Sequence, residues 1–163
     1  MSQETLETLG FHQPALDHLG IAVRNLDEAT EPYRLLGLEI VGEDEMIASQ
    51  HVKVRALKIG ESLLELLEPT SPESPIASFL EKRGPGLHHI ALRVENLETE
   101  IQRLLKQEAK FISTEPRAGR AGTKVVFLHP KWANGVLLEL VEHKRAGVGN
   151  WELGIRENQN PKS

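Results

Sequence analysis

Two segments of the chain occur twice, and this duplication limits the possible folds more than any other feature. The segment 16–27 (LDHLGIAVRNLD) returns at 87–98 as LHHIALRVENLE, and 63–68 (LLELLE) returns at 137–142 as LLELVE. Each copy has a His at an equivalent position near its start, His18 or His89, and a Glu at an equivalent position near its end, Glu65 or Glu139. The duplication predicts two similar structural units, each supplying one imidazole and one carboxylate.

Composition narrows the class of protein. A chain of 163 residues usually forms one domain, here one domain of two similar halves. The net charge of −5 argues against general nucleic-acid binding, and the absence of Cys excludes thiolate ligands and disulfides. Residues 1–7 lack a secretory apolar run, and no stretch has membrane-spanning length. We therefore expect a cytoplasmic protein with neither a nucleic-acid nor a membrane partner.

Hydrophobic periodicity and punctuation residues predict the same order of elements in both halves. The first half is predicted to contain a strand at 15–23, a helix over about 27–36, and strands near 38–42, 52–58 and 63–67. The second half is predicted to contain a strand at 87–94, a helix over about 96–107, a strand near 110–112, a loop at 116–123, and strands at 124–128 and 136–142. A Pro- and Gly-rich linker at 69–86 separates them, with one short helix capped by Ser74 and begun by Pro75.

Each half thus has the order βαβββ, and one such sheet cannot bury its apolar face alone. We expect an α+β fold in which two βαβββ modules form an open β-cup. The predicted domain covers 15–143, with modules at 15–70 and 86–143, a lead-in at 1–14 and a polar tail at 144–163. Whether this tail packs on the domain or a partner, or is disordered, stays open.

The repeated His and Glu residues predict a metal site. A Glu between Leu residues on an apolar strand is costly to bury unless its charge is paired, protonated or bound to metal. Symmetry would gather His18, Glu65, His89 and Glu139, a ligand set that suits a divalent ion such as Co, Mn, Ni, Fe, Zn or Mg. Two coordination positions would remain for a substrate that chelates through two oxygens. The alternative is a polar cleft without metal, in which the repeat is only ancestral.

Several segments carry a resemblance to a known family. They are DHLGIAV at 17–23, ELLEP at 65–69, SPIASFL at 74–80, GLHHIA at 86–91, FLHPK at 127–131 and GVLLEL at 135–140. Over about residues 15–142 the chain resembles the methylmalonyl-CoA epimerase family of the vicinal oxygen chelate superfamily. The resemblance implies that His18, Glu65, His89 and Glu139 are the metal ligands. The family uses either Gln or Glu at the position of Glu65.

The resemblance also implies a reaction, the interconversion of (R)- and (S)-methylmalonyl-CoA through an enolate. Inversion needs two proton-transfer groups on opposite sides of the reacting carbon, and Glu139 is the first candidate. Some family members carry a further Glu on the strand corresponding to 52–58, but here that strand has no acid. Glu65 is ranked first for the second group, with His51 or a metal-bound water as alternatives.

Substrate contacts, assembly and competing functions complete the expectations. The resemblance implies an acyl-CoA substrate, and Lys131 and Arg120 are the candidate contacts for its phosphates. The resemblance implies a homodimer. Two other functions stay open: a glyoxalase-like lyase acting on a glutathione hemithioacetal, and a non-catalytic small-molecule-binding protein of the same superfamily. A ring-cleaving dioxygenase fits less well, because its iron site typically has two His and only one carboxylate.

Overall fold

The computed structural model describes residues 13–144, so the tail from 145 onward and most of the lead-in lie outside the described part. The first half contains β1 (Ala15–Ala22), α2 (Leu26–Leu35), β2 (Ile40–Ile47), the 3₁₀ turn η1 (Ala48–Gln50), β3 (Val52–Ile59) and β4 (Ser62–Pro69). The linker forms α3 (Pro75–Arg83). The second half contains β5 (Gly86–Arg93), α4 (Leu97–Lys106), β6 (Arg117–Ala118), the 3₁₀ turn η2 (Arg120–Gly122), β7 (Lys124–Leu128) and β8 (Leu138–Glu142).

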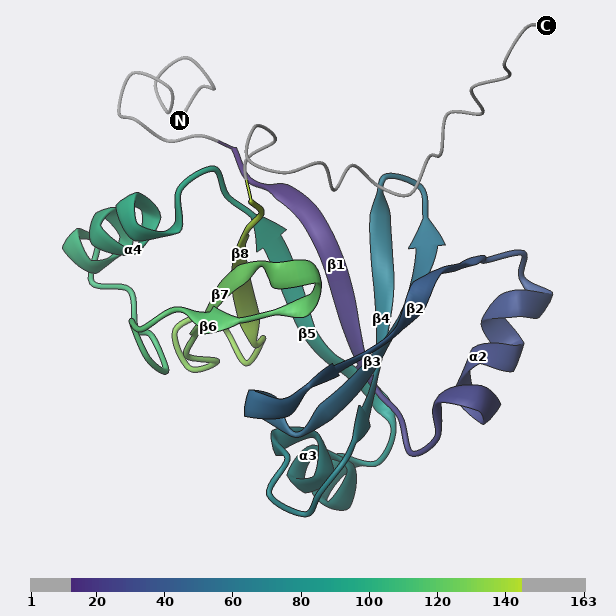
Figure 1. The fold of residues 1–163 in the computed structure, drawn as a ribbon. Coiled ribbons are helices and arrows are strands. Elements are labelled where there is room, and N and C mark those ends of the chain that lie inside the picture. Colours follow the sequence, from purple (N-terminus) through teal and green to yellow (C-terminus); the bar gives the residue numbers. More distant parts are fainter. Residues whose placement is uncertain (1–12, 145–163) are drawn as a thin grey trace, which may run out of the picture.

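All eight strands belong to one mixed sheet, in the order β2-β3-β4-β1-β5-β8-β7-β6. The first strand of each module pairs in parallel with the last strand of the same module, β1 with β4 and β5 with β8. The two first strands pair with each other antiparallel at the centre of the sheet. In Figure 1, α2 and α4 lie on opposite flanks of the curved sheet, and α3 lies at its lower end. The predicted α+β cup of two βαβββ modules is confirmed.

The helices α2 and α4 are capped in the same way by equivalent residues of the two repeats. Asn25 and Asn96 begin α2 and α4, and each side-chain oxygen accepts a hydrogen bond from a backbone N–H in the first turn. Glu68 and Glu142, at the ends of β4 and β8, each accept from the first backbone N–H of the same module's helix at 2.7 Å. These carboxylates satisfy N–H groups that have no partner within the helix. The last Glu of each repeat, Glu68 or Glu142, therefore holds the start of a helix in place. The earlier Glu of each repeat, Glu65 or Glu139, has its side chain on the cup side of the sheet.

One large part of the hydrophobic core lies on the sheet face opposite the cup, whereas other buried residues, such as Val52, Val54 and Leu67, line the cavity itself. Leu64 and Leu66 on β4 pack with Leu57 against residues of α2, and Leu140 on β8 packs with Leu97 of α4. Because side chains alternate along a strand, the Leu residues on either side of Glu65 face the helix while Glu65 faces the cup. Burial of the apolar face thus fixes which side chains line the cup.

The second module departs from the predicted elements between its helix and β7. The predicted strand at 110–112 does not form: Phe111 makes one isolated bridge with Leu128. The two-residue strand β6 lies within the predicted loop instead. Pro116 directly precedes β6 and has no N–H for a ladder hydrogen bond, which is consistent with the interruption of pairing before it. The linker helix, by contrast, begins as predicted, with Ser74 accepting from a backbone N–H in its first turn.

Candidate metal centre and substrate cavity

The register of the sheet places each module's Glu in line with the other module's His. In one row, His18 on β1 lies opposite Ala91 on β5, and Ala91 lies opposite Glu139 on β8. The small Ala side chain in the middle leaves room above the sheet for the two longer side chains. The row therefore directs one imidazole and one carboxylate toward the space above the central strand pair.

The second row is the symmetry equivalent, with a glycine at its centre. Glu65 on β4 lies opposite Gly20 on β1, and Gly20 lies opposite His89 on β5. A Cβ atom at Gly20 would lie 2.1 Å from Cε1 of His89, far inside any normal contact. The imidazole of His89 therefore lies directly over the glycine backbone, a position that only glycine permits.

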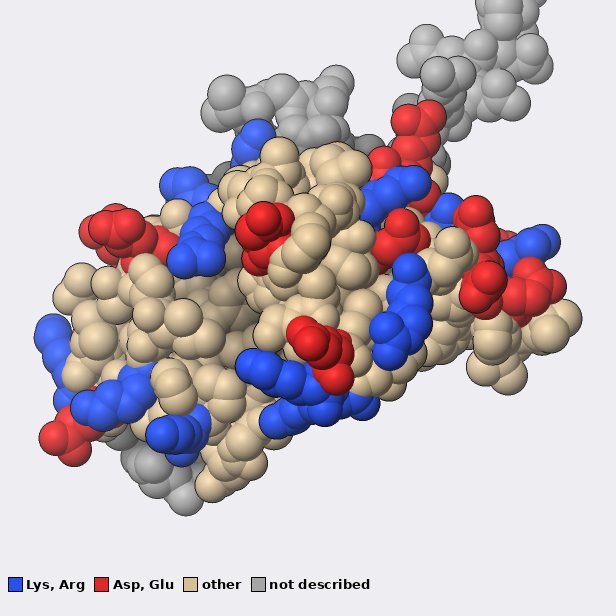
Figure 2. Space-filling view, turned by 90° about the horizontal axis from the view of Figure 1, so that it is seen from below, with Lys and Arg blue, Asp and Glu red and all other residues tan. Residues whose placement is uncertain are grey.

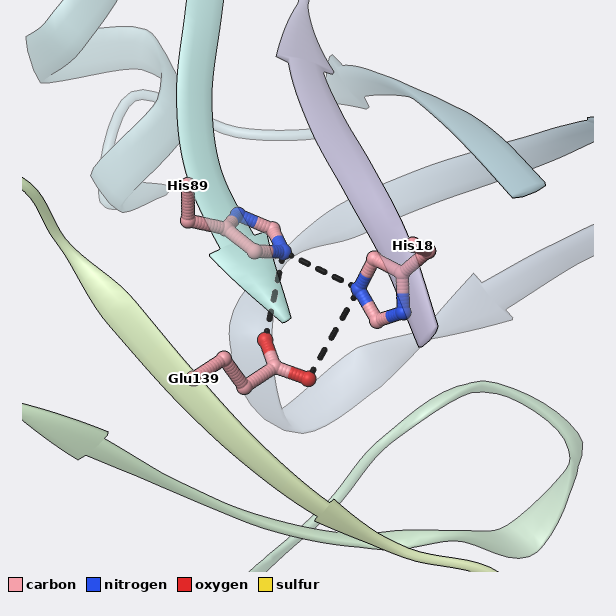
Figure 3. Close-up of side chains that lie close together, drawn as sticks. All are labelled: His18, His89 and Glu139. Atoms are coloured by element: carbon pink, nitrogen blue, oxygen red, sulfur yellow. Dashed lines mark hydrogen bonds and ion pairs between the residues drawn. The ribbon is translucent and has the colours of Figure 1, made fainter. Parts of the chain in front are cut away.

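Three of the four predicted ligands meet at one point. Figure 3 shows the side chains of His18, His89 and Glu139 converging from β1, β5 and β8. The two imidazole Nε2 atoms are 3.1 Å apart, and Nε2 of His89 is 3.2 Å from Oε2 of Glu139. Nε2 of His18 is 3.7 Å from Oε1 of Glu139. All three side chains are buried, and one ligand atom from each lies within 4.8 Å of the others.

Glu65 lies beside this group but is also held from its other side. Its Oε2 atom is 3.5 Å from Nε2 of His18, whereas Oε1 accepts a hydrogen bond from Nε of Arg120 at 2.8 Å. The carboxylate is buried, so the Arg120 guanidinium balances its charge at close range. The predicted role of Glu65 as a fourth metal ligand stays a prediction. The structure places the residue next to the centre, in an ion pair that the sequence did not indicate.

A β-bulge precedes each of the two His residues. The β1–β5 register skips Asp17 on β1 and His88 on β5. A bulge leaves one extra residue unpaired and reorients the local side chains. Both residues line the cup cavity together with the His that follows them, although ideal alternation would direct them to the other face. Each predicted ligand thus gains a polar neighbour on the same side of the sheet.

Asp17 fixes the orientation of His18. Its carboxylate lies 2.8 Å from Nδ1 of His18, 3.0 Å from Nε of Arg93 and 2.5 Å from Nε2 of His143. Burial acts to raise the pKa of Asp17, but the hydrogen bonds from His143 and His18 outweigh it and hold the pKa well below its usual range. An ionised carboxylate only accepts, so Nδ1 of His18 donates to Asp17, and in the neutral ring Nε2 then carries the lone pair that faces the centre.

His88 takes the corresponding place beside His89. The two Nδ1 atoms lie 2.9 Å apart, so one ring donates to the other. Burial lowers the pKa of His88 to about 4, which leaves its imidazole neutral at pH 7. Burial also lowers the pKa of His89, and the neighbouring His18 and His88 rings add to this effect. A neutral imidazole is the form that binds a metal ion.

The charge balance of the centre suits a divalent cation. Burial raises the pKa of Glu139 to about 8, with Glu65 and Asp17 adding to the increase and His18 opposing it. Three carboxylates in one buried space disfavour ionisation of the last unless positive charge compensates. The donor set of imidazole nitrogen and carboxylate oxygen fits Zn, Co, Mn, Ni or Fe. The residues therefore fit a divalent ion.

The centre opens into a cavity of about 450 Å³ that both modules line. Arg120 and His51 lie on its wall, whereas Lys131 is exposed and is not among the residues that line it. Figure 2 shows Lys and Arg side chains interspersed with Asp and Glu on the viewed face, so neither charge forms a continuous surface there. Among residues 13–144, the structure contains no helix long and apolar enough to span a membrane.

Comparison with known proteins now identifies the class. A family model described as the glyoxalase/bleomycin resistance protein/dioxygenase superfamily matches residues 17–127, and the chain belongs to this superfamily. The ethylmalonyl-CoA/methylmalonyl-CoA epimerase of Cereibacter sphaeroides is 41% identical over 128 residues, which cover 77% of this chain and 95% of that protein.

Two solved structures agree with this relative. The methylmalonyl-CoA epimerase of Mycobacterium tuberculosis is 38% identical, with a TM-score of 0.76 over 80% of this chain and 88% of that one. A Streptomyces coelicolor methylmalonyl-CoA epimerase variant in complex with 2-nitronate-propionyl-CoA is 38% identical, with a TM-score of 0.75 over 80% of this chain and 95% of that one. Within the superfamily, the chain belongs to the methylmalonyl-CoA epimerases.

Three features of the site were not predicted from the sequence. Asp17 and His88 precede the two repeated His residues, and their polarity within apolar strands at equivalent places was the available signal. The packing of the His89 ring over Gly20 was also not predicted, and the available signal was that Gly20 aligns with another small residue, Ala91, in the second copy. The pairing of Arg120 with Glu65 had no sequence signal, because it joins a loop of one module to a strand of the other across 55 positions.

Proposed function

We propose that this chain interconverts the two epimers of methylmalonyl-CoA by proton transfer at carbon 2 on a divalent metal centre. The observation that carries the proposal is the convergence of His18, His89 and Glu139 at the base of a cavity in a member of the epimerase family. The related proteins act on, or are bound to, acyl-CoA thioesters, as their names state. An acyl-CoA is accordingly the substrate assigned to this cavity.

His18, His89 and Glu139 would hold the metal ion, with Glu65 proposed as the fourth ligand. When bound, the ion would act as a Lewis acid for the negative charge that develops on the substrate oxygens as the proton leaves. Asp17 keeps Nδ1 of His18 protonated, and this leaves Nε2 as the donor atom. We propose Co, Mn, Ni, Zn or Mg as the ion.

Glu139 and Glu65 are the proposed proton-transfer pair. They project from β8 and β4, which lie on opposite sides of the central β1–β5 pair in the sheet order. A substrate carbon above that pair would therefore have one carboxylate on each side, as inversion requires. Both carboxylates are buried, so bulk water does not compete for the proton. Glu139 takes the proton from one face in our proposal, and Glu65, held by Arg120, exchanges a proton on the other face.

The remaining parts of the proposal concern binding and assembly. Lys131 lies on the surface after β7, and we propose that it contacts the coenzyme phosphates. We also propose a homodimer, a cytoplasmic location, and module limits at 15–70 and 86–143. The homodimer rests on the family resemblance, and the module limits rest on the internal repeat.

Hydrogen–deuterium exchange at carbon 2 of methylmalonyl-CoA in deuterated buffer tests the proposal. We expect rapid exchange that chelator abolishes and added divalent metal restores. Glu139→Gln should reduce the exchange rate by at least about 100-fold, in line with the loss of a general base. Glu61→Gln, on the exposed turn before β4, removes the same charge and should leave the rate unchanged.

Assays on the same purified protein distinguish the two alternative functions from the proposed one. A glyoxalase-like lyase would use the same ligands, but the related proteins carry epimerase names, so that alternative is not favoured. Conversion of a glutathione hemithioacetal without exchange of methylmalonyl-CoA would replace our proposal. Undiminished ligand binding by a metal-free sample with no exchange would instead favour a non-catalytic binding protein.

A further inference from the structure

In the described part of the chain, residues 13–144, Arg120 is the one cavity-lining residue whose guanidinium directly contacts a carboxylate of the proposed metal centre. Its side chain is one-fifth exposed, and Nε donates to Oε1 of Glu65 at 2.8 Å. The residue lies on the turn η2 of the second module, whereas Glu65 lies on β4 of the first. The contact therefore reaches across the cup and brings a fixed positive charge to the edge of the proposed reaction site.

The backbone around Arg120 is fixed from both modules. Ala121, the next residue, has φ of 55° and donates its N–H to the carboxylate of Glu45 at 2.9 Å. Gln50 donates to the carbonyl oxygen of Ala118 at 3.0 Å. Thr123 donates through its hydroxyl to the carbonyl of Arg120 at 2.9 Å. Arg120 thus extends from an anchored turn, so its guanidinium keeps a defined position relative to the centre.

The guanidinium has donors left over after its contact with Glu65. Within residues 13–144, the structure gives a hydrogen bond from Nε but none from either Nη atom of Arg120. The two Nη groups form a planar edge that matches the two oxygens of a carboxylate. Arg120 also lines the cavity, so this edge is accessible to a ligand there.

We propose that Arg120 is a specificity-determining residue that binds the free carboxylate of the acyl group, which selects thioesters carrying a second acidic group. This inference rests on the proposed function and makes it more specific. The location beside Glu65 favours the acyl carboxylate over the coenzyme phosphates that the sequence suggested for Arg120. A bound divalent ion would compensate part of the charge of Asp17, Glu65 and Glu139, and Arg120 adds a further positive charge on the side of Glu65.

The specificity follows from hydrogen-bond chemistry. A thioester without the carboxylate would leave the Nη donors without a charged acceptor, and a charge-assisted bidentate contact contributes about 10- to 100-fold to affinity. Propionyl-CoA has the same acyl chain as methylmalonyl-CoA without the carboxylate, which makes the two ligands a matched pair for this question.

Isothermal titration of the metal-loaded protein with each thioester tests the proposal by binding rather than by activity, with methylmalonyl-CoA added as its equilibrium mixture of epimers so that turnover causes no net change in composition. We expect Arg120→Gln to weaken methylmalonyl-CoA binding about 10- to 100-fold and propionyl-CoA binding by less than about twofold. Arg120→Lys, which keeps the charge but not the planar edge, should fall between wild type and Arg120→Gln. Lys124→Gln, on the exposed start of β7, removes one positive charge nearby and should bind both ligands as wild type does.

Metal content and thermal unfolding of each variant show whether the fold and the centre survive. Equal weakening of both thioesters in a folded, metal-loaded Arg120→Gln protein would overturn the proposal, because Arg120 would then act on the coenzyme or only on Glu65. A wild-type protein that prefers methylmalonyl-CoA in an Arg120-dependent manner but shows no exchange at carbon 2 would support this inference and refute the proposed epimerase activity.

Discussion

Substitution of Gly20 by Ala would displace a proposed metal ligand, the imidazole of His89, without changing the ligand residue itself. The new Cβ would lie 2.1 Å from Cε1, 2.4 Å from Nδ1 and 2.7 Å from Nε2 of His89. Two carbon atoms in normal contact are about 3.5 Å apart, so the imidazole of His89 would have to move by roughly 1.4 Å. The rings of His18, His88 and Phe127 surround His89, with centroids 5.2–5.8 Å away, and restrict that movement.

The substitution should lower both the free energy of unfolding and the metal affinity, and the two losses differ in size. Overpacking of this kind costs about 1–3 kcal/mol of unfolding free energy. A metal site tolerates ligand shifts of only about 0.2 Å, so His89 would leave the coordination sphere. Loss of an orienting neighbour alone costs about 10- to 100-fold in metal affinity, and we expect Gly20→Ala to lose at least about 100-fold.

Titration of the metal-free protein with Co²⁺, read by calorimetry and visible absorption, measures the metal affinity, and urea unfolding measures the stability. Ala91→Gly is the matched control, because it changes the equivalent position opposite His18 in the other row. Its added backbone freedom and lost methyl should cost about 1–2 kcal/mol, with metal affinity unchanged. A Gly20→Ala protein that binds Co²⁺ as tightly as wild type would refute the placement of His89.

Three further changes address the other parts of the site and the scaffold. Glu65→Gln and Glu139→Gln, each assayed for metal content and exchange at carbon 2, should both lower turnover by at least about 100-fold; full activity in Glu65→Gln would show that Glu65 is a ligand only. Asp17→Asn should weaken metal binding by about 10- to 100-fold in equilibrium dialysis, because His18 loses its orienting carboxylate, and wild-type affinity would contradict that role. The hydrogen bond from Arg55 lowers the pKa of Asp44 below its usual value, so this ion pair stabilises the fold at neutral pH and the effect is lost as the pH falls through the folded pKa. Urea unfolding of Asp44→Asn should therefore show lower stability than wild type at pH 7 and a smaller difference at pH 2. An unchanged difference would contradict the ion pair.

The sequence predicted the parts of the fold that depend on local pattern or on internal repetition. Ser74 followed by Pro75 marks a helix start by local chemistry alone, and the structure has that helix. The repeated positions of His18 and His89 needed no knowledge of strand pairing, because equivalent residues in two similar modules meet near the axis that relates them. The strand at 110–112 was predicted wrongly, since Phe111 packs against the core and forms one isolated bridge, whereas Ile112 is exposed and no ladder forms.

Features that depend on pairing between the modules could not be predicted. The bulges at Asp17 and His88 exist only because β1 pairs with β5, and a single strand carries no signal for a register shift. Arg120 looked like one of several surface cations near a glycine-containing loop. Its position beside Glu65 depends on how that loop crosses the cup, and such long-range placement leaves no periodic trace in the sequence.

Anomalous scattering from crystals grown with Co²⁺ tests the metal centre most directly. One peak is expected at about 2.0–2.2 Å from Nε2 of His18, Nε2 of His89 and a carboxylate oxygen of Glu139, at the base of the cavity shared by both modules. A peak elsewhere, or full occupancy of the protein by Co²⁺ with these three side chains uncoordinated, would contradict a metal-assisted reaction at this position.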